Sequence, residues 1–169
     1  MSGPAADRLG SALPMKIAVG SDERTLLTDA LVDDLRERGH EVLLYGPLVA
    51  GDPDVDWPLA CGKAAAAVAR GAADEGIVCC WTGTGASIAA NKVRGVRAAL
   101  CRDAETARGA RIHNHANVLA LSLRATSVAI AKEILDAWLS TPWSDDEWNR
   151  RQVERLRTME DEAGARPAS

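Results

Sequence analysis

The chain has 169 residues, a length typical of one domain, and 47% of them are hydrophobic, which is enough to fill an apolar core. Charged residues make up 26%, the net charge is −4, and Lys and Arg form no block, which argues against a disordered chain and against a dedicated nucleic-acid or membrane-surface protein. No apolar run approaches the roughly 20 residues that a membrane span needs.

The first segment, residues 1–14, is small and polar and lacks the basic start and apolar centre of a signal peptide, so it is predicted to be a flexible extension. A strand is expected at 16–20 and a helix at 24–38, where leucines recur at every fourth position and line one face. The later elements are a strand at 41–45, a loop at 46–56, a helix at 58–73, a strand at 76–80, a turn at 81–85, a helix at 86–93, a strand at 97–101, a helix from 104 to about 112, a strand at 117–121, and helices at 125–139 and 144–163. A flexible tail is expected at 164–169, which leaves a single domain at 15–163.

The alternation of short apolar strands with helices predicts an α/β fold. Five such strands imply parallel pairing through right-handed crossovers, with helices on both faces of the sheet. Ligands bind such sheets at the carboxyl ends of the strands. The loops of interest therefore follow Gly20, Tyr45, Cys80, Cys101 and Leu121.

The four cysteines do not have the spacing of a metal site. Cys79 and Cys80 are adjacent, Cys61 and Cys101 are isolated, and no CxxC pair occurs. We therefore expect no metal and no other cofactor. Without an export signal, the thiols are expected to stay reduced in the cytoplasm.

The turn after the third strand carries the strongest chemical signal, in the segment GIVCCWTGTGASIAANK at 76–92. Gly83 and Gly85 leave backbone N–H groups uncovered where a helix begins, and such a turn can hold an anion or a developing oxyanion. Cys80 ends the strand in this positive field, which favours the thiolate. Thr82 offers a hydroxyl nearby. A base, a hydroxyl and an oxyanion cradle suit proton abstraction next to a carbonyl.

Plainer interpretations of the same residues stay open from spacing alone. Free cysteines often only pack, and the TGTG segment at 82–85 is a weak phosphate-loop signal. The turn is not a Walker loop, and it is not GxGxxG because Ile88 stands where the third glycine would be. His113 could be an exposed histidine at a helix end, and His40 is expected to be a solvated cap.

The same segment resembles the signature of the ribose-5-phosphate isomerase B and galactose-6-phosphate isomerase subunit family, in which a strand ending in Cys meets T-G-x-G and then S-I-A-A-N-K. The resemblance extends over about residues 15–160. Its further matches follow in the family's order: GSD at 20–22, DWP at 56–58, GVRA at 95–98, HN at 113–114, NVLA at 117–120 and DAWL at 136–139.

The resemblance implies a Rossmann-like three-layer αβα sandwich with a five-stranded parallel sheet and an extra C-terminal helix. It implies a homodimer or homotetramer with active sites between subunits, acting on a sugar or sugar phosphate without a metal. Cys80 would move a proton between C1 and C2 with help from Thr82, and His113 would open the sugar ring with help from Asp22. The implied substrate-binding residues are Gly83, Thr84, Gly85, Ala86, Asn114, Trp57 and Trp81.

Several positions depart from the family pattern. Glu23 stands where His is common, and its carboxylate would repel a phosphate. Trp81 replaces a small residue, and Trp148 and Gln152 occupy the positions of two phosphate-gripping arginines. The candidates to replace those arginines are Arg111, Arg124, Arg150, Arg151 and Arg155. For the last three, which lie on the C-terminal helix, the alternative is that they only form a solvent-exposed helix face.

Alternative functions follow from these departures. The same proton transfer could act on a different or an unphosphorylated sugar, or the chain could be a non-catalytic sugar-binding subunit. A nucleotide binder is disfavoured because no GxGxxG follows the first strand.

Overall fold

The computed structural model describes residues 13–164, so nearly all of the extension predicted at 1–14 and of the tail predicted at 164–169 lies outside the described residues. Every strand and helix expected from the sequence is present. In chain order the elements are β1 (Lys16–Ser21), α1 (Leu26–Glu37), β2 (Glu41–Tyr45), the 3-10 helix η1 (Gly46–Leu48), α2 (Trp57–Ala69), β3 (Glu75–Cys80), α3 (Thr84–Asn91), β4 (Ala98–Leu100), α4 (Ala104–Asn114), β5 (Val118–Ser122), α5 (Val128–Ser140) and α6 (Glu147–Gly164).

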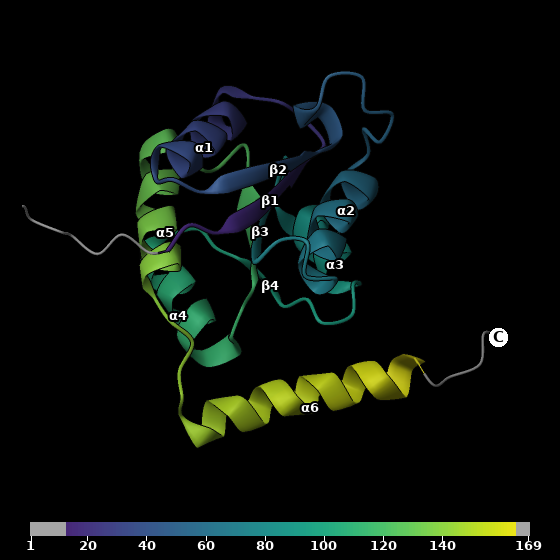
Figure 1. The fold of residues 1–169 in the computed structure, drawn as a ribbon, viewed down its shortest axis with the longest axis vertical. Helices are drawn as coiled ribbons and strands as arrows, with labels where there is room; N and C mark the ends of the chain where they lie inside the picture. The colour runs from purple at the N-terminus through teal and green to yellow at the C-terminus, as the bar shows by residue number, and fades with distance from the viewer. Residues whose placement is uncertain (1–12, 165–169) are drawn as a thin grey trace, which may run out of the picture.

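One parallel sheet holds all five strands in the order β2-β1-β3-β5-β4. Helices α1, α4 and α5 contribute to the core on one face of the sheet, and α2 and α3 to the core on the other (Figure 1). Helix α6 runs beside the sandwich and not over either face (Figure 1). The predicted Rossmann-like three-layer αβα sandwich with an extra C-terminal helix is confirmed.

Small side chains let α2 approach the sheet closely. The face covered by α2 and α3 is filled largely by alanines, and a Cβ on Gly20 would lie 2.6 Å from the carbonyl oxygen of Ala60. A larger residue at Gly20 would push α2 away from β1, because the contacting atom belongs to the backbone. This close packing fixes where α2 begins relative to the carboxyl ends of the strands.

Helix boundaries differ from the sequence prediction where a cap is not visible in the apolar pattern. The helix expected at 58–73 ends at Ala69, because Gly71 takes a φ of 75° and the chain turns there. The helix expected at 86–93 begins at Thr84, so part of the turn predicted at 81–85 belongs to its first turn. The helix expected at 125–139 begins at Val128, after Ser127 caps it.

Candidate active site

The centre of the sheet contains a point where the chain reverses its winding direction. Strands β1 and β3 are neighbours, with Ser21 paired to Cys79. After β1 the chain enters α1 on one face of the sheet, and after β3 it enters α3 on the opposite face. Diverging loops of this kind leave a crevice at the carboxyl edge of a parallel sheet. Asp22 and Cys80 lie directly at that edge.

Cys80 is the last residue of β3, and its sulfur accepts a hydrogen bond from the start of α3. The Ala86 N–H donates to Cys80 Sγ at 3.3 Å, and the Cys80 side chain is almost fully buried. The first N–H groups of a helix have no acceptor within the helix and carry a partial positive charge. The start of α3 therefore directs an N–H donor and its partial positive charge at the Cys80 sulfur.

Gly83 makes this approach of α3 possible. It is the N-terminal cap of α3 with a φ of 76°, and a Cβ built on it would lie 2.6 Å from Leu100 Cδ1 and 2.9 Å from the carbonyl carbon of Leu121. Next to it, the hydroxyls of Thr82 and Thr84 are 2.7 Å apart and both side chains are exposed. The site thus has hydroxyl groups at its solvent side and N–H groups at its floor.

Asp22 contributes a carboxylate with an unfilled acceptor. Its Oδ1 atom is buried and has no hydrogen-bond partner among residues 13–164. Desolvation by burial, with a smaller contribution from the charge of Glu23, raises the pKa of Asp22 above its ordinary value. Burial raises the pKa of Cys79 to about 12, with further contributions from Cys80 and then Asp22, which places this carboxylate within electrostatic reach of the cysteine pair.

Two tryptophans flank the start of α3. Trp57 is the first residue of α2, and its indole covers Gly85 so closely that a Cβ there would lie 3.0 Å from Trp57 Cδ2. Trp81 follows Cys80, and 58% of it is exposed. The Trp81 carbonyl accepts hydrogen bonds from Ser122 Oγ at 2.9 Å and from the Arg124 N–H at 3.0 Å. The backbone of Arg124 is therefore held beside this half of the site.

His113 and Asn114 lie at the opposite edge of the sheet from Cys80. Helix α4 extends to Asn114, two residues past the predicted end, and both side chains are exposed. Strand β5 begins at Val118, which pairs with Gly76, whereas Cys80 pairs with Ser122 at the other end. Four residues of strand span roughly 13 Å. One chain therefore does not bring His113 to its own Cys80.

Arg111 is not available to a substrate, which corrects the role that we predicted for it. Its guanidinium is almost fully buried and pairs with Glu75 Oε1 at 2.7 Å. It also donates to the carbonyl oxygens of Ala116 at 2.7 Å and Thr141 at 3.1 Å. We no longer assign it to the substrate, because each of its three nitrogens is engaged within the protein.

The sequence prediction missed the buried cluster around Arg111. Glu75, the first residue of β3, accepts hydrogen bonds from Arg111 and from the indole of Trp138. Desolvation raises the pKa of Glu75 and lowers that of Arg111, although each charge partly offsets the effect on the other. The sequence did contain a signal for the burial of Arg111, because this residue lies on the same helix face as Ala107 and Ala110, and that face is buried.

Arg150 and Arg151 lie at the same end of the fold as His113. Together with His115 and Trp143 they line an open cavity of about 880 Å³ between α6 and the body of the protein. Arg155 is exposed and donates to the side chain of Gln152. The candidate residues thus fall into two sets, one around Cys80 and one around His113 and the start of α6.

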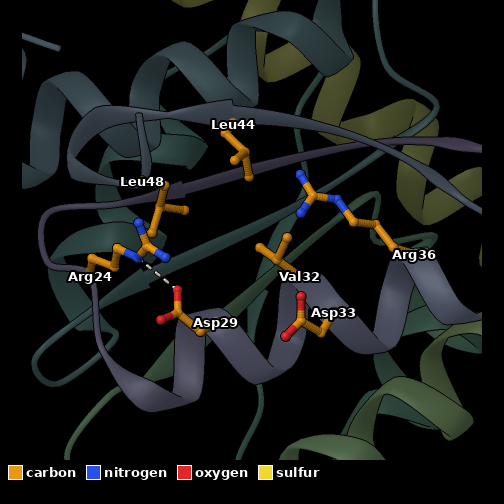
Figure 2. Close-up of a pocket in the computed structure, with 7 residues that line it drawn as sticks. All are labelled: Arg24, Asp29, Val32, Asp33, Arg36, Leu44 and Leu48. Carbon is orange, nitrogen blue, oxygen red and sulfur yellow. Dashed lines mark hydrogen bonds and ion pairs between the residues drawn. The ribbon is translucent and has the colours of Figure 1, made fainter. Parts of the chain in front are cut away.

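A second cavity, of about 310 Å³, lies along α1 and β2 (Figure 2). Arg24 and Asp29 form an ion pair across it at 2.8 Å. The complete lining consists of charged residues of α1 and its preceding loop with three aliphatic side chains: Arg24, Asp29, Val32, Asp33, Arg36, Leu44 and Leu48. It contains none of the candidate site residues.

Neither a metal cluster nor a membrane-spanning helix occurs in the described part of the chain. Among residues 13–164, no three His, Cys, Asp or Glu side chains are grouped as a metal site would require. Within the same residues, every helix is too short or too polar to cross a bilayer.

Comparisons with known proteins find relatives over most of the chain. The sequence profile of the family described as Ribose/Galactose Isomerase matches residues 17–156. The chain is 40% identical over 146 residues to ribose-5-phosphate isomerase B of Escherichia coli, covering 86% of this chain and 96% of that protein. It is 39% identical over 130 residues to D-erythrulose-4-phosphate isomerase of Pectobacterium atrosepticum, covering 74% and 82%. The structure of Clostridium thermocellum ribose-5-phosphate isomerase B superposes with a TM-score of 0.81 at 40% identity, covering 88% of this chain and 99% of that one.

Proposed function

Since the chain belongs to the ribose/galactose isomerase family, we propose that it is an aldose–ketose isomerase that interconverts a small aldose phosphate and its ketose phosphate. Ribose 5-phosphate and ribulose 5-phosphate are the default pair. The observation that carries this proposal is the hydrogen bond from the Ala86 N–H to Cys80 Sγ at the carboxyl edge of the sheet. It supports an ionised sulfur beside a group of N–H donors, which is the arrangement that proton abstraction next to a carbonyl needs.

The proton transfer follows from the residues around Cys80. The Cys80 thiolate takes the proton from C2 of the open-chain aldose, and the electron pair of that C–H bond moves toward the carbonyl to give an enediolate. The N–H groups of Thr84 and Gly85 stabilise the enediolate oxygen, because the N–H groups of Gly83 and Ala86 already donate to the carbonyl oxygen and the sulfur of Cys80. The hydroxyl of Thr82 moves a proton between the oxygens on C1 and C2, and Cys80 returns its proton to C1. No metal takes part in this scheme.

His113 of a second subunit is proposed to complete the site. An imidazole can donate and accept protons near neutral pH, which suits opening of the cyclic sugar. The unfilled Oδ1 of Asp22 would accept a hydrogen bond from a ring hydroxyl, and Asn114 would bind substrate oxygens. The separation of His113 from Cys80 within one chain supports a homodimer or homotetramer with active sites between subunits.

The phosphate is proposed to bind to arginines from both sets of residues. Arg150 and Arg151 line the cavity near His113, and Arg124 is held beside Trp81. Arginine matches phosphate geometry through paired N–H groups. Arg155 would add to these only if the second subunit turned it toward the cavity.

A tetrose phosphate is the second candidate substrate. A relative that is 39% identical acts on D-erythrulose 4-phosphate by its name, and the exposed Trp81 follows the base where the family has a small residue. A large indole there favours a shorter sugar. The carboxylate of Glu23 and the exposed Trp148 also keep an unphosphorylated sugar and a non-catalytic subunit as outcomes of the test.

The buried free cysteines suit a reducing compartment, so we place the protein in the cytoplasm.

The test uses Cys80→Ala and a panel of four- to six-carbon aldoses and ketoses, with and without phosphate, in the presence of EDTA. Wild-type protein should interconvert one phosphorylated pair, and Cys80→Ala should lose this activity while keeping its circular dichroism spectrum. Full turnover by Cys80→Ala would remove the assigned base.

A mixing experiment tests the site between subunits. Cys80→Ala and His113→Ala are each expected to be inactive on ribose 5-phosphate. Subunit exchange between them should restore about a quarter of the wild-type sites, because half of the dimers become hybrid and each hybrid has one intact site. No recovery after verified exchange would contradict a shared site.

A further inference from the structure

Arg111 joins three separate parts of the fold. Its Nη2 pairs with Glu75 Oε1 at 2.7 Å at the start of β3, and its Nε donates to the carbonyl oxygen of Thr141 at 3.1 Å after α5. Its Nη1 donates to the carbonyl oxygen of Ala116 at 2.7 Å, just after α4. The guanidinium also stacks over the indole of Trp138, with 5.1 Å to the ring centroid. A lysine could satisfy only part of this set, because its single nitrogen lacks the planar fork.

The residues that follow His113 are held by the same cluster. His115 ends α4 in the left-handed conformation with a φ of 47°, which is uncommon for a residue other than glycine. Its carbonyl oxygen accepts from Arg97 Nε at 2.8 Å, and its ring stacks on Trp143 with 5.4 Å between centroids. The Ala116 carbonyl accepts a second hydrogen bond, from Trp143 Nε1 at 3.2 Å. The chain is therefore fixed immediately after the last turn of α4.

The side chain of His113 differs from this anchored backbone because it is exposed. Arg111 and His113 are two residues apart on α4, so their side chains point to different sides of the helix, Arg111 inward and His113 outward. The cluster thus holds the helix end without covering the imidazole.

Buried ion pairs such as Glu75–Arg111 often add little net stability, which favours a geometric role for this one. Burying two charges costs desolvation free energy that their attraction often only offsets, and apolar pairs of similar volume are commonly as stable. What an apolar pair cannot do is bond the carbonyl oxygens of Ala116 and Thr141. The cluster specifies a geometry at the end of α4.

We infer that Arg111 is a positioning residue for His113, and that the Glu75–Arg111–Trp138 cluster sets where the imidazole lies in the shared active site. This inference rests on the proposed function, in which His113 opens the sugar ring. Arg111 itself does not touch the substrate. Its replacement should slow ring opening without weakening the binding of the sugar phosphate.

The test isolates ring opening in the Cys80→Ala background, where proton transfer at carbon is blocked. Interconversion of the two anomers of ribose 5-phosphate labelled with ¹³C at C1 is measured by magnetisation transfer, and binding is measured by calorimetry. Arg111→Lys is compared with Arg108→Lys, a matched change on the exposed side of α4 where Arg108 contacts Glu105 at 3.2 Å. We expect Arg111→Lys to slow anomer exchange at saturation about tenfold with Kd within about twofold, and Arg108→Lys to change neither.

Two results would overturn the inference. The first is an unchanged rate of anomer exchange in a folded Arg111→Lys variant. The second is a Kd about tenfold weaker with a normal exchange rate at saturation, which would indicate that Arg111 binds phosphate. If Arg111→Lys does not fold, Trp143→Phe removes one hydrogen bond to Ala116 at a half-buried site and should slow exchange about threefold, whereas normal exchange contradicts the inference. If His113→Ala leaves exchange intact, the ring-opening role in the proposed function fails instead.

Discussion

Replacing Gly83 with alanine probes how the start of α3 is built. Gly83 has a φ of 76°, and the left-handed region costs an alanine about 1–2 kcal/mol. The new Cβ would also lie 2.6 Å from Leu100 Cδ1 and 2.9 Å from the carbonyl carbon of Leu121, and overpacking of this kind costs about 1–3 kcal/mol. The two effects together predict a loss of about 2–5 kcal/mol in the free energy of unfolding.

Gly71→Ala is the matched control, because Gly71 has a φ of 75° and no atom lies within 4 Å of its Cβ position. For a chain of this length, 1 kcal/mol shifts the Tm by about 2–4 °C. Calorimetry should therefore show a decrease in Tm of about 4–20 °C for Gly83→Ala and about 2–8 °C for Gly71→Ala. The kcat should fall only in Gly83→Ala, where the Ala86 N–H loses its alignment with Cys80. Equal Tm shifts with wild-type kcat in both variants would refute the close approach at Gly83.

Three further predictions concern buried charges and thiols. Glu75→Leu leaves Arg111 as an unpaired buried charge and should cost about 3–5 kcal/mol in urea unfolding, whereas adding Arg111→Met should recover most of it; additive losses would contradict this. Burial raises the pKa of Asp22, so its ionised form destabilises the fold, and the stability present at low pH is lost as the pH rises through that pKa. Asp22→Asn should therefore raise the Tm more near pH 7 than near pH 3.5, and an equal gain at both would count against the buried carboxylate. Burial raises the pKa of Cys101 to about 12, so iodoacetamide at about pH 8 should alkylate Cys80 first by peptide mass spectrometry, and faster labelling of Cys101 would argue against a stabilised Cys80 sulfur.

Local patterns in the sequence determined the secondary-structure elements and the residues that surround Cys80. Apolar runs and helical spacing predicted all five strands and six α-helices among residues 13–164. This was possible because a buried strand or a buried helix face requires apolar residues at regular, closely spaced positions in the sequence. The proposed base, the hydroxyl and the glycine turn occupy seven consecutive positions from Cys80 to Ala86, so their mutual geometry follows from one strand end and one helix start. The predicted helix starts were less accurate, because apolar spacing does not show which residue caps a helix. The left-handed Gly83 caps α3 and Ser127 caps α5.

Only the tertiary structure decided which distant residues meet. The strand order β2-β1-β3-β5-β4 places Asp22 beside the cysteine pair, although more than fifty residues separate them in the sequence. The same order leaves His113 at the opposite edge from Cys80, and it buries Arg111 against Glu75 where the sequence had suggested a phosphate ligand. Crossovers and helix packing set these neighbours through interactions between segments far apart in the chain. The sequence of either segment by itself does not show which distant segment it will contact.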